Sequence, residues 1–320
     1  MTNPIAVTMG DPSGIGPECV AKTWTHIRAS DNHFFVIADP TLYHDVPVQI
    51  IEHPSEAAEV FEHQLPVIPL ELQVPPQLGH PDPRNASAVV ASIRQAVHLC
   101  QSGAASAVMT APISKSTLKE GTDFPYPGHT EFLAHLGGDV PVAMMLASEQ
   151  LRVIPVTIHI PLSEVAPTLS EQAVFETITL ADRELRHRFD IDQPRIAVAG
   201  LNPHAGENGH MGTEDQSVIA SAIARAQAHG ITVKGPLPAD TMFHARARAS
   251  YDVAICMYHD QALIPIKTLD FDRGVNVTLG LPFVRTSPDH GTAFDIAGKG
   301  VASAEATIEA IQLAAQLGKG

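Results

Sequence analysis

The sequence predicts an α/β protein, and two observations support that fold class. Short apolar runs of strand length alternate along the chain with longer stretches whose apolar residues recur every three or four positions. Several of the short runs are apolar on both faces, which is typical of strands covered by helices on both sides. At 320 residues, the chain is long enough for two domains of ordinary size or one large α/β unit.

The expected strands follow one another from the N-terminus. Residues 5–9 form the first, and the others are expected at 34–39, 106–111, 142–147, 151–158, 195–200, 231–235, 252–257 and 275–280. The runs 142–147 and 151–158 are joined by Ser148-Glu149-Gln150, which indicates a β-hairpin and therefore a mixed sheet. The proline-rich segment 65–84 is the least regular stretch, and we expect it to run over the surface.

The helices are predicted from apolar stripes. Val89, Ile93, Ala96 and Cys100 share one helical face, with Ser87 as the expected N-cap. The same pattern recurs over 174–185 and 304–315. A further stripe over 218–230 ends at a glycine, the residue most often found just past a helix C-terminus.

Composition limits the classes of function. Lys plus Arg number 20 and Asp plus Glu 35, a net charge of −15, which argues against a nucleic-acid binder. A small anionic substrate would need local positive charge against this acidic background. No apolar run approaches the ~18 residues that span a bilayer, and the N-terminus lacks the pattern of a signal peptide. Cys19, Cys100 and Cys256 show no CxxC spacing, so we expect buried free thiols and a cytoplasmic protein.

The turn at 10–18 (GDPSGIGPE) follows a strand and precedes a helix, the context of a nucleotide-binding loop. Its spacing does not match one, because Gly14-x-Gly16 lacks the third glycine of a dinucleotide loop and no Gly-Lys-Ser/Thr follows. A tight strand-to-helix turn with Pro17 in the first helical turn explains most of it. That interpretation leaves Asp11 and Glu18 without a role.

Three histidines occupy equivalent places. His159, His204 and His259 each lie at or just past the carboxyl end of an apolar strand. Ligands bind at that edge of open α/β sheets, so the three imidazoles could converge on a divalent metal. Asp240 or Asp260 could add a carboxylate. The alternative, in which each histidine only caps a strand end, stays open.

A few polar residues could hold an anion. Lys267 and Arg285 are basic residues with apolar flanks, whereas Arg273 is interpreted as a surface charge. His129 and Thr130 stand at a predicted helix start, where N–H groups and a hydroxyl can face an anion.

Several long segments together resemble the 4-hydroxythreonine-4-phosphate dehydrogenases of vitamin B6 biosynthesis. The resemblance covers about residues 5–315 and is carried by MGDPSGIGPE (9–18), PGHTEF (127–132), GLNPHAGENGHMGTED (200–215), GPLPADTMF (235–243), MYHDQ (257–261) and RGVNVTLGLPFVRTS (273–287).

The resemblance implies an isocitrate/isopropylmalate-dehydrogenase-like fold of two α/β/α domains with a cleft between them. The first domain would comprise 1–130 and 283–320, and the second, 131–282, would carry the metal ligands and dimer contacts. A homodimer with its active site at the interface is implied, with no nucleic-acid or membrane partner. The resemblance also implies NAD or NADP as the cofactor. It further implies one divalent metal (zinc, magnesium or cobalt), which would be bound by His159, His204 and His259.

The implied reaction is NAD-dependent oxidation of 4-phosphooxy-L-threonine at C3, followed by decarboxylation to 3-amino-2-oxopropyl phosphate. The family's substrate contacts fall on His129, Thr130, Lys267, Asn276 and Arg285, and Lys267 is also expected to be catalytic. The cofactor-binding residues stay unassigned. Two alternatives are a dehydrogenase of threonate or erythronate 4-phosphate and a metal-dependent phosphatase.

Overall fold

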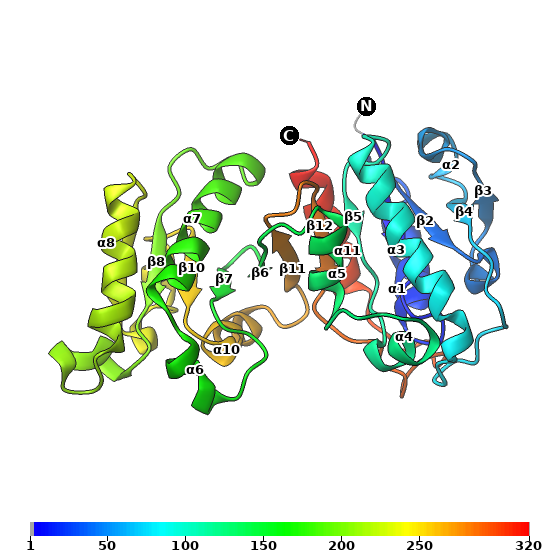
Figure 1. The fold of residues 1–320 in the computed structure, drawn as a ribbon. Coiled ribbons are helices and arrows are strands. Elements are labelled where there is room, and N and C mark those ends of the chain that lie inside the picture. Colours follow the sequence, from blue (N-terminus) through cyan, green and yellow to red (C-terminus); the bar gives the residue numbers. More distant parts are fainter. Residues whose placement is uncertain (1–2, 320) are drawn as a thin grey trace. The chain divides into compact units, whose positions relative to one another are not determined.

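A computed structural model describes residues 3–319 and divides the chain into two compact units (Figure 1). Unit 1 holds the described residues up to Val142 and those from Leu281 onwards, and unit 2 comprises Ala143–Gly280. The segments 131–142 and 281–282, expected from the sequence in the second domain, both lie in unit 1. Unit 2 is therefore inserted into unit 1, which is built from both ends of the chain.

Unit 1 contains a parallel sheet with the strand order β3-β4-β2-β1-β5-β12. In chain order its strands are β1 (Ile5–Thr8), β2 (Phe34–Ala38), β3 (Val48–Ile50), β4 (Leu65–Pro69), β5 (Val108–Met109) and β12 (Arg285–Pro288). Every residue of β1 and β2 is buried, because helices cover both faces of the sheet as the sequence predicts.

The helices of unit 1 fall into two groups by their contacts. One group is α3 (Ala86–Gln101), which packs on β1, β2 and β5 and touches α4 (Lys115–Gly121) and α5 (His129–Leu136). The other is α1 (Gly16–Ile27) with α11 (Glu305–Leu317), and α11 packs on β12, β5 and β1. Shorter elements are η1 (Pro40–Tyr43), η2 (Pro54–Glu56), α2 (Ala57–Val60) and η3 (Pro83–Asn85).

Unit 2 contains a mixed sheet with the strand order β11-β6-β7-β10-β8-β9. Its strands are β6 (Ala143–Ala147), β7 (Arg152–Pro155), β8 (Ile196–Ala199), β9 (Val233–Leu237), β10 (Val253–Cys256) and β11 (Val275–Leu279). β11, β6 and β7 pair antiparallel, and the β6–β7 pair is the hairpin predicted from the sequence. β7, β10, β8 and β9 run parallel to one another.

Helices of unit 2 again form two groups. α7 (Glu171–Arg188) packs against α8 (Ser221–Ala228), whereas α10 (His259–Leu269) packs on β7, β10 and β6. The core between α10 and the sheet includes Ile266 of the helix and Leu146, Val153, Ala254 and Cys256 of the strands. The remaining elements are α6 (Leu162–Thr168), η4 (Pro203–Gly209), the π-helical turn η5 (Asp215–Ala220), η6 (Ala239–Thr241) and α9 (Ala245–Arg248).

The structure confirms the α/β prediction, adds the unpredicted strands β3 and β12, and corrects two further expectations. Residues 65–69 form β4, which is buried between β3 and β2, so the first part of the proline-rich segment is not a surface loop. Helix α3 starts after Asn85, and Ser87 lies inside the helix rather than at its N-cap.

Cys19 and Cys256 are buried free thiols as expected, while Cys100 is half-buried. None of the helices described over 3–319 has the length and apolarity to cross a membrane.

Candidate functional site

Two of the three strand-end histidines of unit 2 come together. His159 follows β7 and His259 follows β10, and these strands are parallel neighbours with Pro155 opposite Cys256. Beyond the strands, the Thr157 hydroxyl donates a hydrogen bond of 2.7 Å to the Met257 carbonyl. The two imidazole ring centroids consequently lie 5.9 Å apart, with the ring planes tilted by 41°.

His259 has a carboxylate neighbour of the kind that supports metal ligands. Its Nδ1 lies 2.7 Å from Oδ1 of Asp260. A carboxylate at Nδ1 favours the tautomer in which Nε2 carries no proton, the form that binds a divalent cation. This donor chemistry fits a metal site at the ends of β7 and β10.

His204 does not join this pair in the structure. Its strand, β8, is the other neighbour of β10, so the three histidines follow three adjacent parallel strands. His204, however, lies in the exposed turn η4, where residues 204–208 all have left-handed φ angles between 41° and 77°. Residues other than glycine adopt this backbone conformation only at a cost in free energy, and such strain is concentrated at functional sites. Within residues 3–319, no group of three His, Cys, Asp or Glu side chains is placed to hold a metal ion.

The loop that carries His204 is stabilised by hydrogen bonds to the Asp215 side chain. This carboxylate is fully buried, and it accepts hydrogen bonds from the backbone N–H groups of Leu201 at 2.8 Å and Asn202 at 3.2 Å. A Cβ on Gly200 would lie 2.6 Å from the Asp215 carboxylate, so glycine is required there by the close approach.

Gln261 links the two strand ends that precede His204 and His259. Its Nε2 donates to the Gly200 carbonyl and its Oε1 accepts from the Met257 N–H, both at 2.7 Å. No motif or periodicity in the sequence marks Gln261 or Asp215. Both lie inside segments that carry the family resemblance, and that position was the only signal available for them.

The other site residues expected in unit 2 lie on separate elements. Lys267 is half-buried on α10, with its Nζ 5.6 Å from the centroid of the Phe271 ring. Asn276 is half-buried on β11, opposite Leu146 of β6. The side chains of Arg273, Asp240 and Asp260 are exposed.

In unit 1, Arg285 begins β12 and is only 4% exposed. Its Nε and Nη2 both donate to the hydroxyl of Thr110, at 3.0 and 2.6 Å. Burial lowers the pKa of Arg285 to about 10, so the guanidinium still carries its charge at neutral pH. Thr110 therefore fixes the orientation of a buried cation.

His129 is the first residue of α5, and its Nε2 is buried without a hydrogen-bond partner among the described residues. Burial lowers the pKa of this imidazole well below 6.5, and the positive charges of Arg285 and Lys115 lower it further. The ring is therefore neutral at pH 7. Gly128 at the N-cap offers no side chain, so the first N–H groups of the helix, including that of Thr130, have no side-chain cap. Together these groups can receive an anion.

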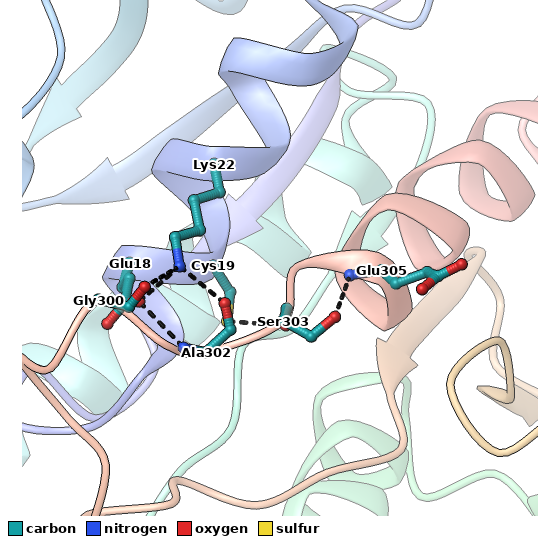
Figure 2. Close-up of polar contacts among 7 residues, drawn as sticks. All are labelled: Glu18, Cys19, Lys22, Gly300, Ala302, Ser303 and Glu305. Carbon is teal, nitrogen blue, oxygen red and sulfur yellow. Dashed lines mark hydrogen bonds and ion pairs between the residues drawn. The ribbon is translucent and has the colours of Figure 1, made fainter.

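A separate cavity of about 750 Å³ lies in unit 1 between α1, residues 42–46 and the loop containing Gly298 and Gly300. Figure 2 shows how that loop is attached to α1. Lys22 Nζ lies 2.7 Å from Glu18 Oε1 and donates to the carbonyls of Gly300 and Ala302 at 2.9 and 2.8 Å, while Glu18 accepts from the Ala302 N–H at 3.2 Å. Glu18 thus has a structural role.

Asp11 also has a structural role in the opening turn. It is 4% exposed, and its Oδ1 accepts a hydrogen bond of 3.0 Å from the Ser13 N–H. Burial raises the pKa of this carboxyl. The two acidic residues that the sequence left unexplained therefore stabilise the turn and its neighbouring loop.

The chain is similar in sequence to known proteins of about the same length. The family model described as pyridoxal phosphate biosynthetic protein PdxA matches residues 24–314. A protein of Ruegeria sp. (strain TM1040) named 4-hydroxythreonine-4-phosphate dehydrogenase is 56% identical over 316 residues, 98% of this chain and 97% of the relative. A protein of the same name from Roseobacter denitrificans is 53% identical over 317 residues, 99% of this chain and 97% of that one.

A solved structure agrees with these sequence matches. The crystal structure of 4-hydroxythreonine-4-phosphate dehydrogenase from Klebsiella pneumoniae superimposes with a TM-score of 0.90 at 40% identity, covering 99% of this chain and 100% of that chain.

Proposed function

The chain belongs to the PdxA family of pyridoxal phosphate biosynthetic proteins, and on that premise we propose that it is a 4-hydroxythreonine-4-phosphate dehydrogenase. The observation that carries this function is 56% identity to a protein of that name over 98% of the chain. A threonate or erythronate phosphate dehydrogenase and a metal-dependent phosphatase are less well supported, because the relatives reported above share one name.

The reaction is an oxidation followed by loss of carbon dioxide. A hydride leaves C3 of 4-phosphooxy-L-threonine for the nicotinamide of NAD or NADP while the C3 hydroxyl loses its proton, which leaves a β-keto acid. That acid then releases CO2, and protonation of the resulting enolate gives 3-amino-2-oxopropyl phosphate. Both steps place negative charge on the oxygen at C3, so that atom needs electrostatic stabilisation.

We assign that stabilisation to a divalent cation, zinc, magnesium or cobalt, bound by His159, His204 and His259. When bound, the cation supplies Lewis-acid chemistry to the substrate oxygen. Two observations on the chain's own residues support the assignment: the rings of His159 and His259 lie 5.9 Å apart, and Asp260 contacts His259 Nδ1. We further propose a cytoplasmic homodimer in which the active site, including the full ligand set, is completed at the subunit interface.

The remaining residues bind and orient the substrate. Arg285 supplies a buried positive charge whose direction is fixed by Thr110, and His129 supplies a neutral imidazole beside it. Thr130 contributes a hydroxyl and a backbone N–H at the start of α5. In unit 2, Asn276 contributes an amide and Lys267 a charge, and Lys267 is also proposed to take part in catalysis.

The test is formation of NADH from 4-phosphooxy-L-threonine by the purified protein. We expect activity only with a divalent cation present, loss of activity on chelation, and recovery on adding zinc, magnesium or cobalt. Release of inorganic phosphate without NADH would instead identify a phosphatase, and a preference for threonate 4-phosphate would identify the other dehydrogenase. Mass measurement in solution tests the homodimer.

The metal assignment has a matched pair of variants. His204→Ala should abolish metal binding and activity, because it removes a proposed ligand without disturbing the core. His210→Ala changes an exposed histidine just past the same turn and should leave both unchanged. The assignment would be contradicted if His204→Ala, treated with chelator and then supplied again with the divalent cation, showed full activity.

A further inference from the structure

Lys115 is the first residue of α4, directly after the N-cap Ser114, whose hydroxyl accepts from the Thr117 N–H. A cation is unfavourable at this end of a helix, because the helix dipole and the N–H groups of the first turn present partial positive charge there. Lys115 is exposed, so it also adds little to the packing of α4. The local structure therefore gives no reason for a lysine at this position.

The side chain of Lys115 extends to the start of α5. A Cβ placed on Gly128, the N-cap of α5, would lie 3.1 Å from Lys115 Cε and 3.3 Å from its Nζ. Gly128 has a φ angle of −174°, which any residue can adopt, so backbone conformation does not require glycine there. The absence of a side chain instead leaves room for the lysine chain against the helix N-terminus.

The groups around this ammonium form a site for an anion within unit 1. His129 is adjacent to Gly128, with a buried Nε2 that has no hydrogen-bond partner among the described residues. The buried guanidinium of Arg285 acts electrostatically on the same imidazole, as does Lys115. Glu131 Oε2 lies 3.4 Å from the same Cβ position, but no ion pair joins it to Lys115 in the part of the chain that the structure describes.

We propose that Lys115 is a further substrate-binding residue, which together with Arg285 and His129 holds the phosphate group of the substrate. This inference rests on the proposed function. A phosphate monoester carries nearly two negative charges at neutral pH and three acceptor oxygens. Two cations, an imidazole and the uncapped N–H groups of α5, a helix of eight residues, match that charge and acceptor number. The carboxylate of the substrate lies at its other end, next to the carbons that react.

The first test measures steady-state kinetics of Lys115→Met, which keeps the chain length and removes the charge. We expect KM for 4-phosphooxy-L-threonine to rise roughly 10–100-fold with kcat changed less than about threefold, the loss typical of one charged hydrogen bond. Lys115→Arg should recover most of the affinity. The control Lys119→Met, one turn along α4 and also exposed, should behave as the wild type. An unchanged KM in Lys115→Met would overturn the proposal.

A second test identifies which substrate group is held. Inorganic phosphate should bind to the wild type in calorimetric titration and compete with the substrate, and Lys115→Met should weaken both effects by the same factor as KM. A raised KM with unchanged phosphate binding would show that Lys115 contacts a different group, which also overturns the proposal. If the wild type forms no NADH but Lys115→Met still loses phosphate affinity, the proposed function fails and the phosphate site stands.

A structural role for Lys115 is tested separately by thermal unfolding. Because its charge opposes the dipole of α4, Lys115→Met should unfold at the same temperature as the wild type or slightly above it. A clear fall in unfolding temperature together with the rise in KM would indicate that the lysine only stabilises the fold, against the proposal.

Discussion

At the scale of single residues, the anion site of unit 1 combines a buried cation with a neutral histidine. Arg285 stays charged at neutral pH because burial lowers its pKa only to about 10. His129 loses its proton because burial and two nearby cations lower its pKa. The site therefore carries the positive charge of Arg285, and His129 adds no further charge to it. The protonation state of His129 can be measured through the stability of the protein.

We expect His129 to make folding stability depend on pH below about 6.5. The unfolded chain binds a proton at this histidine below its ordinary pKa of 6.5, but the folded chain does not. Lowering the pH from 7.5 to 5.5 should therefore reduce the free energy of unfolding by at most about 1.4 kcal/mol through this residue. His129→Gln should lack that part of the decrease in urea unfolding measured at both pH values. An identical pH dependence in both proteins would show that folding does not lower the pKa of His129.

Asp215 provides a second prediction at this scale. Asp215→Asn keeps the shape but replaces one acceptor oxygen with a donor, facing the N–H groups of Leu201 and Asn202. We expect a loss of about 1–3 kcal/mol in the free energy of unfolding, and weaker metal binding through the displaced loop of His204. Glu214→Gln is the control, since the neighbouring Glu214 accepts from the Asn202 side chain rather than from the N–H groups of Leu201 and Asn202. Equal stability of the two variants would exclude the supporting role of Asp215.

Sequence patterns could identify some of these residues and not others. The positions of His159 and His259 are predictable because the carboxyl ends of parallel strands meet at one edge of a sheet. Thr110 could not be predicted as the partner of Arg285, which follows 175 residues later, because no periodicity links the two. A substrate-binding role for Lys115 could not be predicted from the sequence either. It depends on the N-terminus of α4 lying close to the N-terminus of α5, which no sequence pattern shows.

At the scale of elements, helices α3, α7 and α11 and most of the apolar strands were predicted, whereas β3, β4 and β12 were not. The stripes of α3, α7 and α11 are long enough to establish their period. β4 reads LPVIP and contains two prolines, which normally argue against an inner strand. β12 reads RTSP and is buried although it is polar, because Thr286 donates to the Ala310 carbonyl and Arg285 bonds to Thr110.

The link between α1 and the loop 298–303 leads to a prediction at this scale. Lys22→Met removes hydrogen bonds to Gly300 and Ala302, so the loop should open more often (Figure 2). We expect the Ala302 amide to exchange with deuterated water about 10-fold faster, since one or two partly exposed hydrogen bonds are lost. Lys299→Met, in the same loop with an exposed side chain, is the control. Unchanged exchange at Ala302 would mean that Glu18 alone holds the loop.

At the scale of the whole molecule, the two units can be followed separately. The single tryptophan, Trp24, lies on α1 in unit 1, is 2% exposed, and donates to the Phe61 carbonyl at 2.8 Å. Unit 2 contains no tryptophan. Fluorescence therefore reports on unit 1, whereas circular dichroism reports on both units.

A chain ending at Gly280 should keep unit 2 and lose unit 1. This truncation removes β12, which pairs with β5, and α11, which packs on α1. We expect the emission of Trp24 to shift towards that of an exposed indole while a substantial helical signal remains in circular dichroism. The full-length chain serves as the control. A blue-shifted emission in the truncated chain would show that residues up to 142 fold without their C-terminal partners.

The insertion of unit 2 into unit 1 also determines the order in which the nascent chain can fold. The ribosome completes β1 to β5 early, but β5 remains an unpaired edge until residues 285–288 have been made. All of unit 2 is synthesised in that interval and can reach its final pairing first. Until then, unit 1 therefore presents an unpaired strand edge, which can pair with other chains.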